Sequence, residues 1–109
     1  MADENIEKAY EAIEVAKTSG KLKKGANEVT KVVEKGKAKL VVIADDTNPK
    51  EIIMHIPLLC EEKKIPCITV PKKEELGAAA GLPVGTSAVA ITEEGESKRL
   101  IKELSSKSK

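Results

Sequence analysis

Hydrophobic residues follow two patterns that alternate along the chain. The first is the spacing of an amphipathic helix, in which apolar positions recur at i, i+3, i+4 and i+7. The second is a short apolar run of strand length. From these patterns we predict helices over residues 5–19, 26–35, 48–64, 72–80 and 97–104, and strands over residues 21–24, 40–44, 67–70 and 87–91.

The alternation of helices and strands indicates an α/β fold. We predict a three-layer α-β-α sandwich, with a central four-stranded mixed sheet and helices on both faces. Residues 40–44 are all apolar, as expected for a central strand that is covered on both faces. The length of 109 residues suits a single domain over residues 1–109, in which residues 105–109 form a flexible tail.

Two prolines mark the predicted third helix. Asn48 as N-cap, Pro49 at the first helical position and Glu51 at the third resemble a capping box, so we expect the helix to begin there. Pro57 lies further along and is expected to kink or restart the helix, because proline removes a backbone donor and its ring crowds the preceding turn.

The stretch from Lys23 to Lys31 reads Lys-Lys-Gly-Ala-Asn-Glu-Val-Thr-Lys. A lysine-rich segment here turns through Gly25 into a predicted helix. Asn27 and Glu28 then fall in the first turn, where free backbone N–H groups and the positive end of the helix dipole attract phosphate and other anions. This stretch is therefore a candidate recognition site.

Helical geometry divides the same segment into two faces, because successive residues advance by about 100°. The polar members, which spread over about 100° of the helical wheel, are Asn27, Glu28, Lys31 and Lys35. The opposite face is apolar or small and is expected to bury against the sheet. Its members are Ala26, Val29, Val32, Val33 and Gly36.

Charge is unevenly distributed although the net charge is only +1. Residues 21–39 hold seven lysines against Glu28 and Glu34. Such a local excess of cations is typical of a surface that contacts phosphates. The simpler alternative, a solvated lysine face without a ligand, stays open at this point.

Aromatic content limits the kind of nucleic acid that the chain could bind. Tyr10 is the only aromatic residue, and it is expected in the core. Binding that stacks successive single-stranded bases on aromatic side chains is therefore excluded. A nucleic-acid partner would have to be read through its shape, its phosphates or its base edges.

Residues that could support catalysis or metal binding do not form a recognisable set. Cys60, Cys67 and His55 fall short of the four ligands of a structural zinc site, and the two cysteines are expected in the core in reduced form. Asp45 and Asp46 could act as metal ligands or an acid/base pair, but adjacent side chains at a strand end diverge, which favours a solvated loop. We predict no enzymatic activity, no metal and no cofactor.

Glycine patterns and hydropathy argue against a nucleotide-binding, a membrane or a secreted protein. The chain contains neither a P-loop nor a G-x-G-x-x-G fingerprint, so no nucleotide cofactor is indicated. No apolar run approaches the roughly 20 residues of a membrane helix, and the acidic start with Asp3 and Glu4 is unlike a signal peptide. We expect a cytoplasmic protein without a membrane partner.

The loop over residues 82–86 is apolar, with the sequence Leu-Pro-Val-Gly-Thr. Connecting loops lie on the surface and are usually polar, so exposed apolar residues in one of them indicate recognition.

Four segments together resemble the archaeal L7Ae ribosomal protein family. The similarity extends over about residues 5–104. It depends most on the motif Gly-x-Asn-Glu-x-Thr-Lys and on its place ahead of the later matching segments. The matching segments are residues 22–31, 40–44, 55–63 and 76–81.

The resemblance implies a kink-turn RNA-binding protein without catalytic activity. Members of this family act in the large ribosomal subunit and, in archaea, also in box C/D and box H/ACA guide ribonucleoproteins and in ribonuclease P. They stabilise the kinked RNA so that other ribonucleoprotein core proteins assemble on it. We expect RNA and those proteins as partners, no DNA, and a monomer in isolation.

The resemblance also implies which residues contact the RNA. The segment of Asn27, Glu28 and Lys31 would read the guanines of tandem sheared G·A pairs, and the loop Leu82–Val84 would pack against the bulge and its flipped-out nucleotide. Val84 stands where the eukaryotic guide-particle relatives carry arginine, which favours the archaeal kind. The complete predicted RNA-binding set is Lys24, Gly25, Asn27, Glu28, Lys31, Lys35, Ile52, Leu82, Pro83 and Val84.

The chemistry of these residue types agrees with that role. Asn and Lys donate to guanine O6 and N7, a carboxylate accepts from base N–H groups, and the flanking lysines Lys24, Lys35 and Lys37 could hold phosphates. A protein-interaction scaffold of the same fold, without RNA binding, is the alternative. An enzyme that uses Asp45, Asp46, His55 or Cys60 is disfavoured by the absence of a triad.

Overall fold

The computed structural model describes residues 2–47 and 50–107. The α-helices are α1 (Ala2–Ser19), α2 (Ala26–Glu34), α3 (His55–Lys63), α4 (Lys73–Ala79) and α5 (Lys98–Lys107). Two short 3-10 helices are η1 (Lys50–Ile52) and η2 (Gly95–Ser97). The strands are β1 (Lys21–Lys24), β2 (Leu40–Ala44), β3 (Cys67–Val70) and β4 (Ala88–Glu93).

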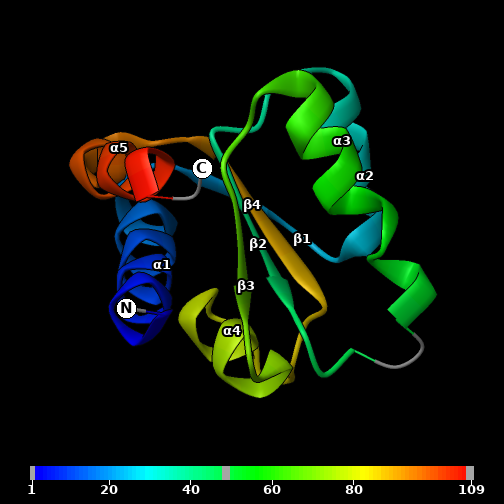
Figure 1. Ribbon diagram of the computed structural model, residues 1–109. Coiled ribbons are helices and arrows are strands. Elements are labelled where there is room, and N and C mark those ends of the chain that lie inside the picture. The colour runs from blue at the N-terminus through cyan, green and yellow to red at the C-terminus, as the bar shows by residue number, and fades with distance from the viewer. Residues whose placement is uncertain (1, 48–49, 108–109) are drawn as a thin grey trace.

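The four strands form one mixed sheet in the order β1-β4-β2-β3. β2 and β3 are parallel, whereas β4 lies antiparallel to both of its neighbours. The helices α1, α4 and α5 cover one face of the sheet, and α2 and α3 cover the other (Figure 1). The predicted sandwich with a four-stranded mixed sheet is confirmed.

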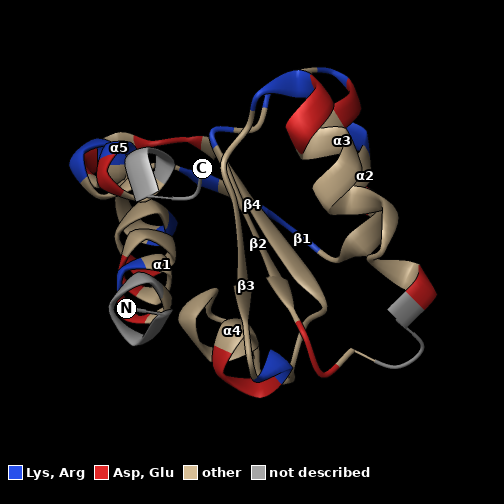
Figure 2. Ribbon diagram, in the orientation of Figure 1, with Lys and Arg blue, Asp and Glu red and all other residues tan. Residues whose placement is uncertain are grey.

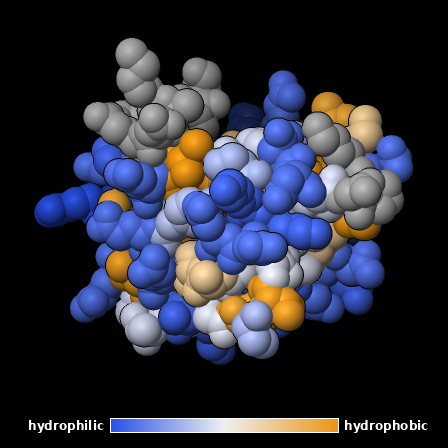
Figure 3. Space-filling view, turned by 90° about the horizontal axis from the view of Figure 1, so that it is seen from below, coloured by the Kyte–Doolittle hydropathy of each residue, from blue (hydrophilic) through white to orange (hydrophobic). Residues whose placement is uncertain are grey.

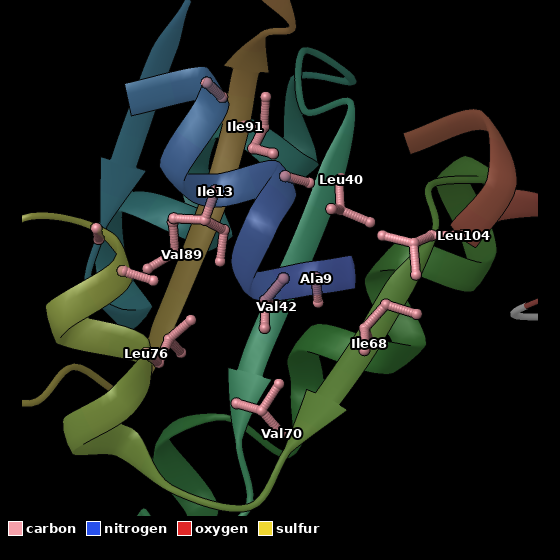
Figure 4. Close-up of a cluster of buried hydrophobic side chains, with 14 of the residues drawn as sticks. Ala9, Ile13, Leu40, Val42, Ile68, Val70, Leu76, Val89, Ile91 and Leu104 are labelled. Carbon is pink, nitrogen blue, oxygen red and sulfur yellow. The ribbon is translucent and has the colours of Figure 1, made fainter. Parts of the chain in front are cut away.

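The alternating sides of the strands account for two hydrophobic clusters. Successive strand residues point to opposite faces, so Val42 packs under α1, α4 and α5, while Val41 and Ile43 pack under α2 and α3. All five residues of β2 are buried, which explains its uninterrupted apolar sequence. Figure 4 shows the larger cluster, in which Leu76 of α4 lies toward Val89, and Leu104 of α5 lies toward Leu40 and Ile68.

The first helix begins earlier than the hydrophobic pattern predicts, at Ala2 instead of residue 5. The three residues before residue 5 are neither Gly nor Pro, so nothing in them stops the helix.

The expected helix over residues 48–64 is wrong as a single element. The 3-10 turn η1 is followed by a separate helix that begins at His55; the proposed cap Asn48 and its neighbour Pro49 lie outside the described residues. Of the two effects predicted for Pro57, the restart is the one observed, because α3 begins at His55. Pro57 causes no kink, since it is the third residue of α3, where a backbone N–H has no partner within the helix.

The last helix is also longer than expected. α5 continues to Lys107 and so includes residues 105–107, which the sequence pattern assigned to a tail; Ser108 and Lys109 lie outside the described residues. Ile101 and Leu104 anchor this helix in the core, and helix propagation then adds residues at little cost. In the described part of the chain, no helix has the length and apolar character needed to span a membrane.

Candidate nucleic-acid interface

The amino end of α2 is set by Gly25, which links it to the sheet. Gly25 has φ 93° and ψ 147°, a conformation that residues with a side chain rarely adopt. Its N–H donates to the carbonyl of Ala88 at the start of β4 (2.8 Å), and its own carbonyl accepts from Val29 N–H (3.0 Å). The chain therefore turns sharply out of β1 and starts a helix whose first turn is fixed to the sheet.

The two faces predicted for α2 are present in the structure. Ala26, Val29, Val32 and Val33 are buried, and the exposed side chains are Asn27, Glu28, Lys31 and Lys35. Gly36 is an exception, since it was expected on the buried face. It is exposed and follows the helix with φ 70°, so it ends α2 instead of packing beneath it.

Three of the predicted recognition side chains gather at the amino end of α2. Asn27 and Glu28 lie in its first turn and Lys31 lies in the next turn, with Lys31 Nζ 3.9 Å from Glu28 Oε1. Both side chains of this ion pair are more than half exposed, so the pair contributes little to stability. Its charged groups are thus available to a ligand at small cost.

Lysines approach the same end of α2 along β1. Lys23 and Lys24 are exposed and directly precede Gly25, and Lys24 pairs with Val89 in the sheet. The basic strand β1 leads to the start of α2 in Figure 2. Cations therefore flank the amino end of the helix, where the helix dipole also attracts anions.

The loop between α4 and β4 ends beside the same point, because it runs into Ala88, the residue that accepts the Gly25 N–H. Leu82 is half-buried, Pro83 is exposed and Val84 is 67% exposed. The structure therefore places the predicted loop at the same end of the sheet as the amino end of α2.

A third predicted contact, Ile52, follows β2 at this end of the sheet. It ends η1 and is 41% exposed. Met54 (62% exposed) and Leu58 (69% exposed) extend the exposed apolar surface onto α3, although the sequence analysis did not single them out. Their i, i+4 spacing on a helix was the available signal, but it is the same signal that a buried helix face gives. Figure 3, a view of this end of the molecule, shows small apolar patches separated by hydrophilic surface.

Lys35 does not join the group at the amino end of α2. It is the C-cap of the helix, and eight residues at a rise of 1.5 Å place it about 12 Å along the axis from Asn27. Lys35 and Lys37 therefore lie toward the opposite end of the sheet, near the other lysines of the loops drawn at the top of Figure 2. Lys35 shares a side of α2 with the recognition residues but lies farther along the helix.

A hydrogen bond ties α2 to α3 next to the candidate interface. His55 Nε2 lies 2.8 Å from Thr30 Oγ1, and the Thr30 hydroxyl donates to the Ala26 carbonyl at 2.7 Å. Since the single hydroxyl proton is used on Ala26, the arrangement is satisfied when Nε2 carries the proton and His55 donates. His55 is exposed and has a structural partner in Thr30.

The other residues considered for catalysis are dispersed and serve the fold. Asp46 Oδ1 accepts the Lys73 N–H at 2.8 Å and so caps α4; the sequence analysis had expected a solvated side chain here, without this role. Cys60 is buried and Cys67 half-buried; contact with the Cys60 thiol, together with burial, raises the pKa of the Cys67 thiol, which keeps it protonated. Among the described residues, no three His, Cys, Asp or Glu side chains are placed to hold a metal ion.

Tyr10 marks the contact between α1 and α4, on the far face of the sheet from α2. It packs against the core, and its buried hydroxyl has no hydrogen-bond partner among the described residues. Burial, followed by the negative charge of Glu75, raises the pKa of Tyr10 to about 12. The shallow hollow beside it carries both signs of charge from Glu14, Lys17 and Glu75, unlike the basic approach to α2.

Comparisons with known proteins identify the family of the chain. The family model described as "Ribosomal protein L7Ae/L30e/S12e/Gadd45 family" matches residues 7–101. The solved structure of the Giardia lamblia 15.5kD RNA binding protein superposes with a TM-score of 0.90 at 33% sequence identity, over 96% of this chain and 88% of that chain. The chain belongs to the ribosomal protein L7Ae/L30e/S12e/Gadd45 family.

Proposed function

We propose that this protein binds RNA and recognises the kink-turn, a sharp bend built on tandem sheared G·A pairs. The observation that carries the proposal is the exposed group of Asn27, Glu28 and Lys31 at the amino end of α2, held on a buried valine stripe. A solved protein of the same fold and 33% identity that is named as an RNA-binding protein supports it.

The chemistry of the group fits guanine edges. Asn27 and Lys31 can donate to O6 and N7, and Glu28 can accept from base N–H groups. A surface that bound phosphate alone would have little use for the carboxylate of Glu28. Ordinary A-form RNA keeps its major groove too narrow for side chains, whereas a kink with non-Watson-Crick pairs opens it to the end of a helix.

The other predicted residues, except Lys35, lie at the same end of the sheet as this group. Lys24 approaches from β1 to hold a phosphate, and Gly25 lets the RNA backbone come close to the first turn of α2. Leu82, Pro83 and Val84 provide an apolar surface for the flipped-out nucleotide, and the exposed side chain of Ile52 adds to it.

The proposal extends to the biological setting. The RNA partners are ribosomal RNA, box C/D and box H/ACA guide RNAs and ribonuclease P RNA, in the archaeal pattern that the sequence resembles. The protein acts in the cytoplasm without catalysis, and stabilises the kinked RNA for the assembly of other core proteins.

A gel-shift titration tests the proposal. The wild-type protein is titrated against a kink-turn RNA and against the same RNA with its G·A pairs replaced by Watson-Crick pairs. Tight binding to the first and loss of tight binding to the second is the expected result. Equal affinity for both RNAs would leave only general attraction between lysines and phosphates.

A protein-interaction scaffold is the second candidate, because Met54 and Leu58 expose apolar side chains on α3. The two functions differ in which variants fail. Glu28→Ala would weaken RNA binding, whereas Leu58→Ser would leave it intact and weaken a protein contact only. If the wild-type protein bound no kink-turn RNA, the scaffold would become the leading function.

A further inference from the structure

The loop over residues 82–86 sits directly on α4, and Gly77 makes this possible. Gly77 is buried in the middle of α4, and a side chain there would overlap the carbonyl oxygen of Val84 and approach Gly85 Cα to 2.9 Å. The Gly77 carbonyl accepts the Leu82 N–H at 2.8 Å. The same residue therefore makes room for the loop and binds its first amide.

A second set of contacts fixes the end of the loop. Gly85 lies against Lys73, since a Cβ on Gly85 would come within 3.0 Å of Lys73 Cγ. Thr86, which is buried, donates its N–H to the Lys73 carbonyl at 3.1 Å. The loop is thus attached to α4 both near its middle and at its amino end.

The hydroxyl of Thr86 connects the loop to α2. It donates to the Ala88 carbonyl at 3.2 Å, and the same carbonyl accepts the Gly25 N–H at 2.8 Å. The loop and the first turn of α2 therefore share one acceptor. A carbonyl oxygen has two lone pairs, so both bonds can form together.

We propose that Gly77 and Thr86 are positioning residues, which hold the apolar loop Leu82–Val84 at a fixed place beside the amino end of α2. This inference rests on the proposed function, because the loop is then the part that contacts the flipped-out nucleotide. Neither residue needs to touch the RNA. Both residues are buried and act on the loop through contacts within the protein, which fits a positioning role.

Gly77→Ala tests whether the loop must pack closely on α4, and Gly20→Ala is the matched control. A side chain at Gly20 would also overlap a backbone carbonyl, that of Glu93, but at the opposite end of the sheet from the loop. We expect Gly77→Ala to weaken kink-turn binding about tenfold, as displacement by a crowded side chain implies. Gly20→Ala should keep the wild-type affinity, although both variants lose stability in a thermal melt.

Thr86→Val removes the hydroxyl while it keeps the shape and the N–H of the residue. We expect it to weaken kink-turn binding about two- to tenfold, the range of one hydrogen bond, and we expect Thr86→Ser to restore it. Thr92→Val is the control, because Thr92 also donates to a backbone carbonyl, that of Lys21, but at the far end of β4.

A second RNA separates positioning from general stability. In this RNA the flipped-out nucleotide lacks its base. Removal of the base should weaken binding by the wild type and by both control variants, but should cost Gly77→Ala and Thr86→Val little further affinity. Equal sensitivity to the missing base in all proteins would overturn the proposal, as would equal losses of affinity in variants and controls.

Amide hydrogen exchange on the free protein tests the positioning without RNA. The Leu82 and Thr86 amides should exchange faster in Gly77→Ala than in the wild type, while the Val29 amide of α2 stays protected. Unchanged exchange at Leu82 and Thr86 would refute the role of Gly77. Failure of the wild type to prefer kink-turn RNA would instead refute the proposed function, so the two failures are distinguishable.

Discussion

The amino end of α2 and the loop Leu82–Val84 lie at the same end of the sheet but are placed by different means. Gly25 at the start of α2 has no atom within 4 Å of the position of a side chain, and only its φ of 93° calls for glycine. Gly77 beneath the loop is in a helix of ordinary conformation, and only the lack of space calls for glycine. Gly25 is therefore required by its backbone conformation, whereas Gly77 is required by close packing.

This difference shows that the position of the loop depends on the rest of the fold more than the first turn of α2 does. The first turn of α2 is built from neighbouring residues, a glycine, a valine stripe and polar side chains at helical spacing. The loop has no regular structure, and its position depends on α4, Lys73 and the Ala88 carbonyl. Damage to α4 should therefore disturb the loop and spare α2.

The largest effect is expected for Leu76→Ala, which removes a fully buried side chain of α4 from the larger core cluster. Its free energy of unfolding should fall by about 2–5 kcal/mol, because the deletion loses transfer free energy and leaves a cavity. Urea denaturation measures the loss.

Hydrogen exchange on the same variant tests the comparison itself. Faster exchange at Leu82 and Thr86 than at Val29 would agree with a loop that depends on α4. Val29→Ala, which truncates a buried residue of α2, is the control and should show the reverse order. Uniform acceleration in both variants would mean that the two regions form one cooperative unit.

Glu28→Ala should weaken kink-turn binding by about 1–3 kcal/mol, the usual cost of one base-reading side chain. Its stability should stay at the wild-type value, since Glu28 is exposed and its ion pair with Lys31 spans 3.9 Å. Isothermal titration calorimetry gives the affinity. Glu34→Ala, an exposed glutamate in the last turn of the same helix, should bind normally; similar losses in the two variants would count against a specific role of Glu28.

Lys35→Ala tests how far the interface extends along α2. If Lys35 contacts a phosphate, the variant should bind all RNAs more weakly and reduce the slope of log affinity against log salt by about 1. Titrations at several salt concentrations measure the slope. An unchanged slope would confine the RNA to the amino end of α2, about 12 Å away.

Tyr10→Phe should have the smallest effect and no influence on RNA affinity at neutral pH. Because burial and Glu75 raise the pKa of Tyr10 from 10.0 to about 12, the folded state keeps a proton that the unfolded state releases between these values. Stability from this source is complete below pH 10 and is lost as the pH rises toward 12.

Denaturation of both proteins across this range checks that sign. The wild type should lose stability relative to Tyr10→Phe as the pH rises above 10. Parallel pH profiles would show that the environment of Tyr10 does not favour its protonated form.

The sequence predicted the amino end of α2 well because its signals are local. The conformation of Gly25, the buried face of Val29, Val32 and Val33, and the exposed polar residues all follow from spacing within a dozen residues. Gly36 was misplaced only because the helix ends just before it.

The packing of the loop on α4 could not be predicted from such local signals. The sequence showed an apolar loop, but nothing near Gly77 indicated that its missing side chain leaves room for Val84. Asp46 illustrates the same limit, since it caps α4 from 27 residues away. At Pro57 the sequence left a kink and a restart open, because the effect of the proline depends on where the helix begins; the structure has the restart, with α3 beginning at His55.

A double-mutant cycle between protein and RNA tests the central claim most directly. The affinities of wild type and Glu28→Ala are measured for the kink-turn RNA and for the RNA with Watson-Crick pairs in place of the G·A pairs. If Glu28 reads those pairs, the two changes are non-additive, and the RNA change costs Glu28→Ala much less than it costs the wild type. Additive losses would contradict recognition of the G·A pairs by the amino end of α2.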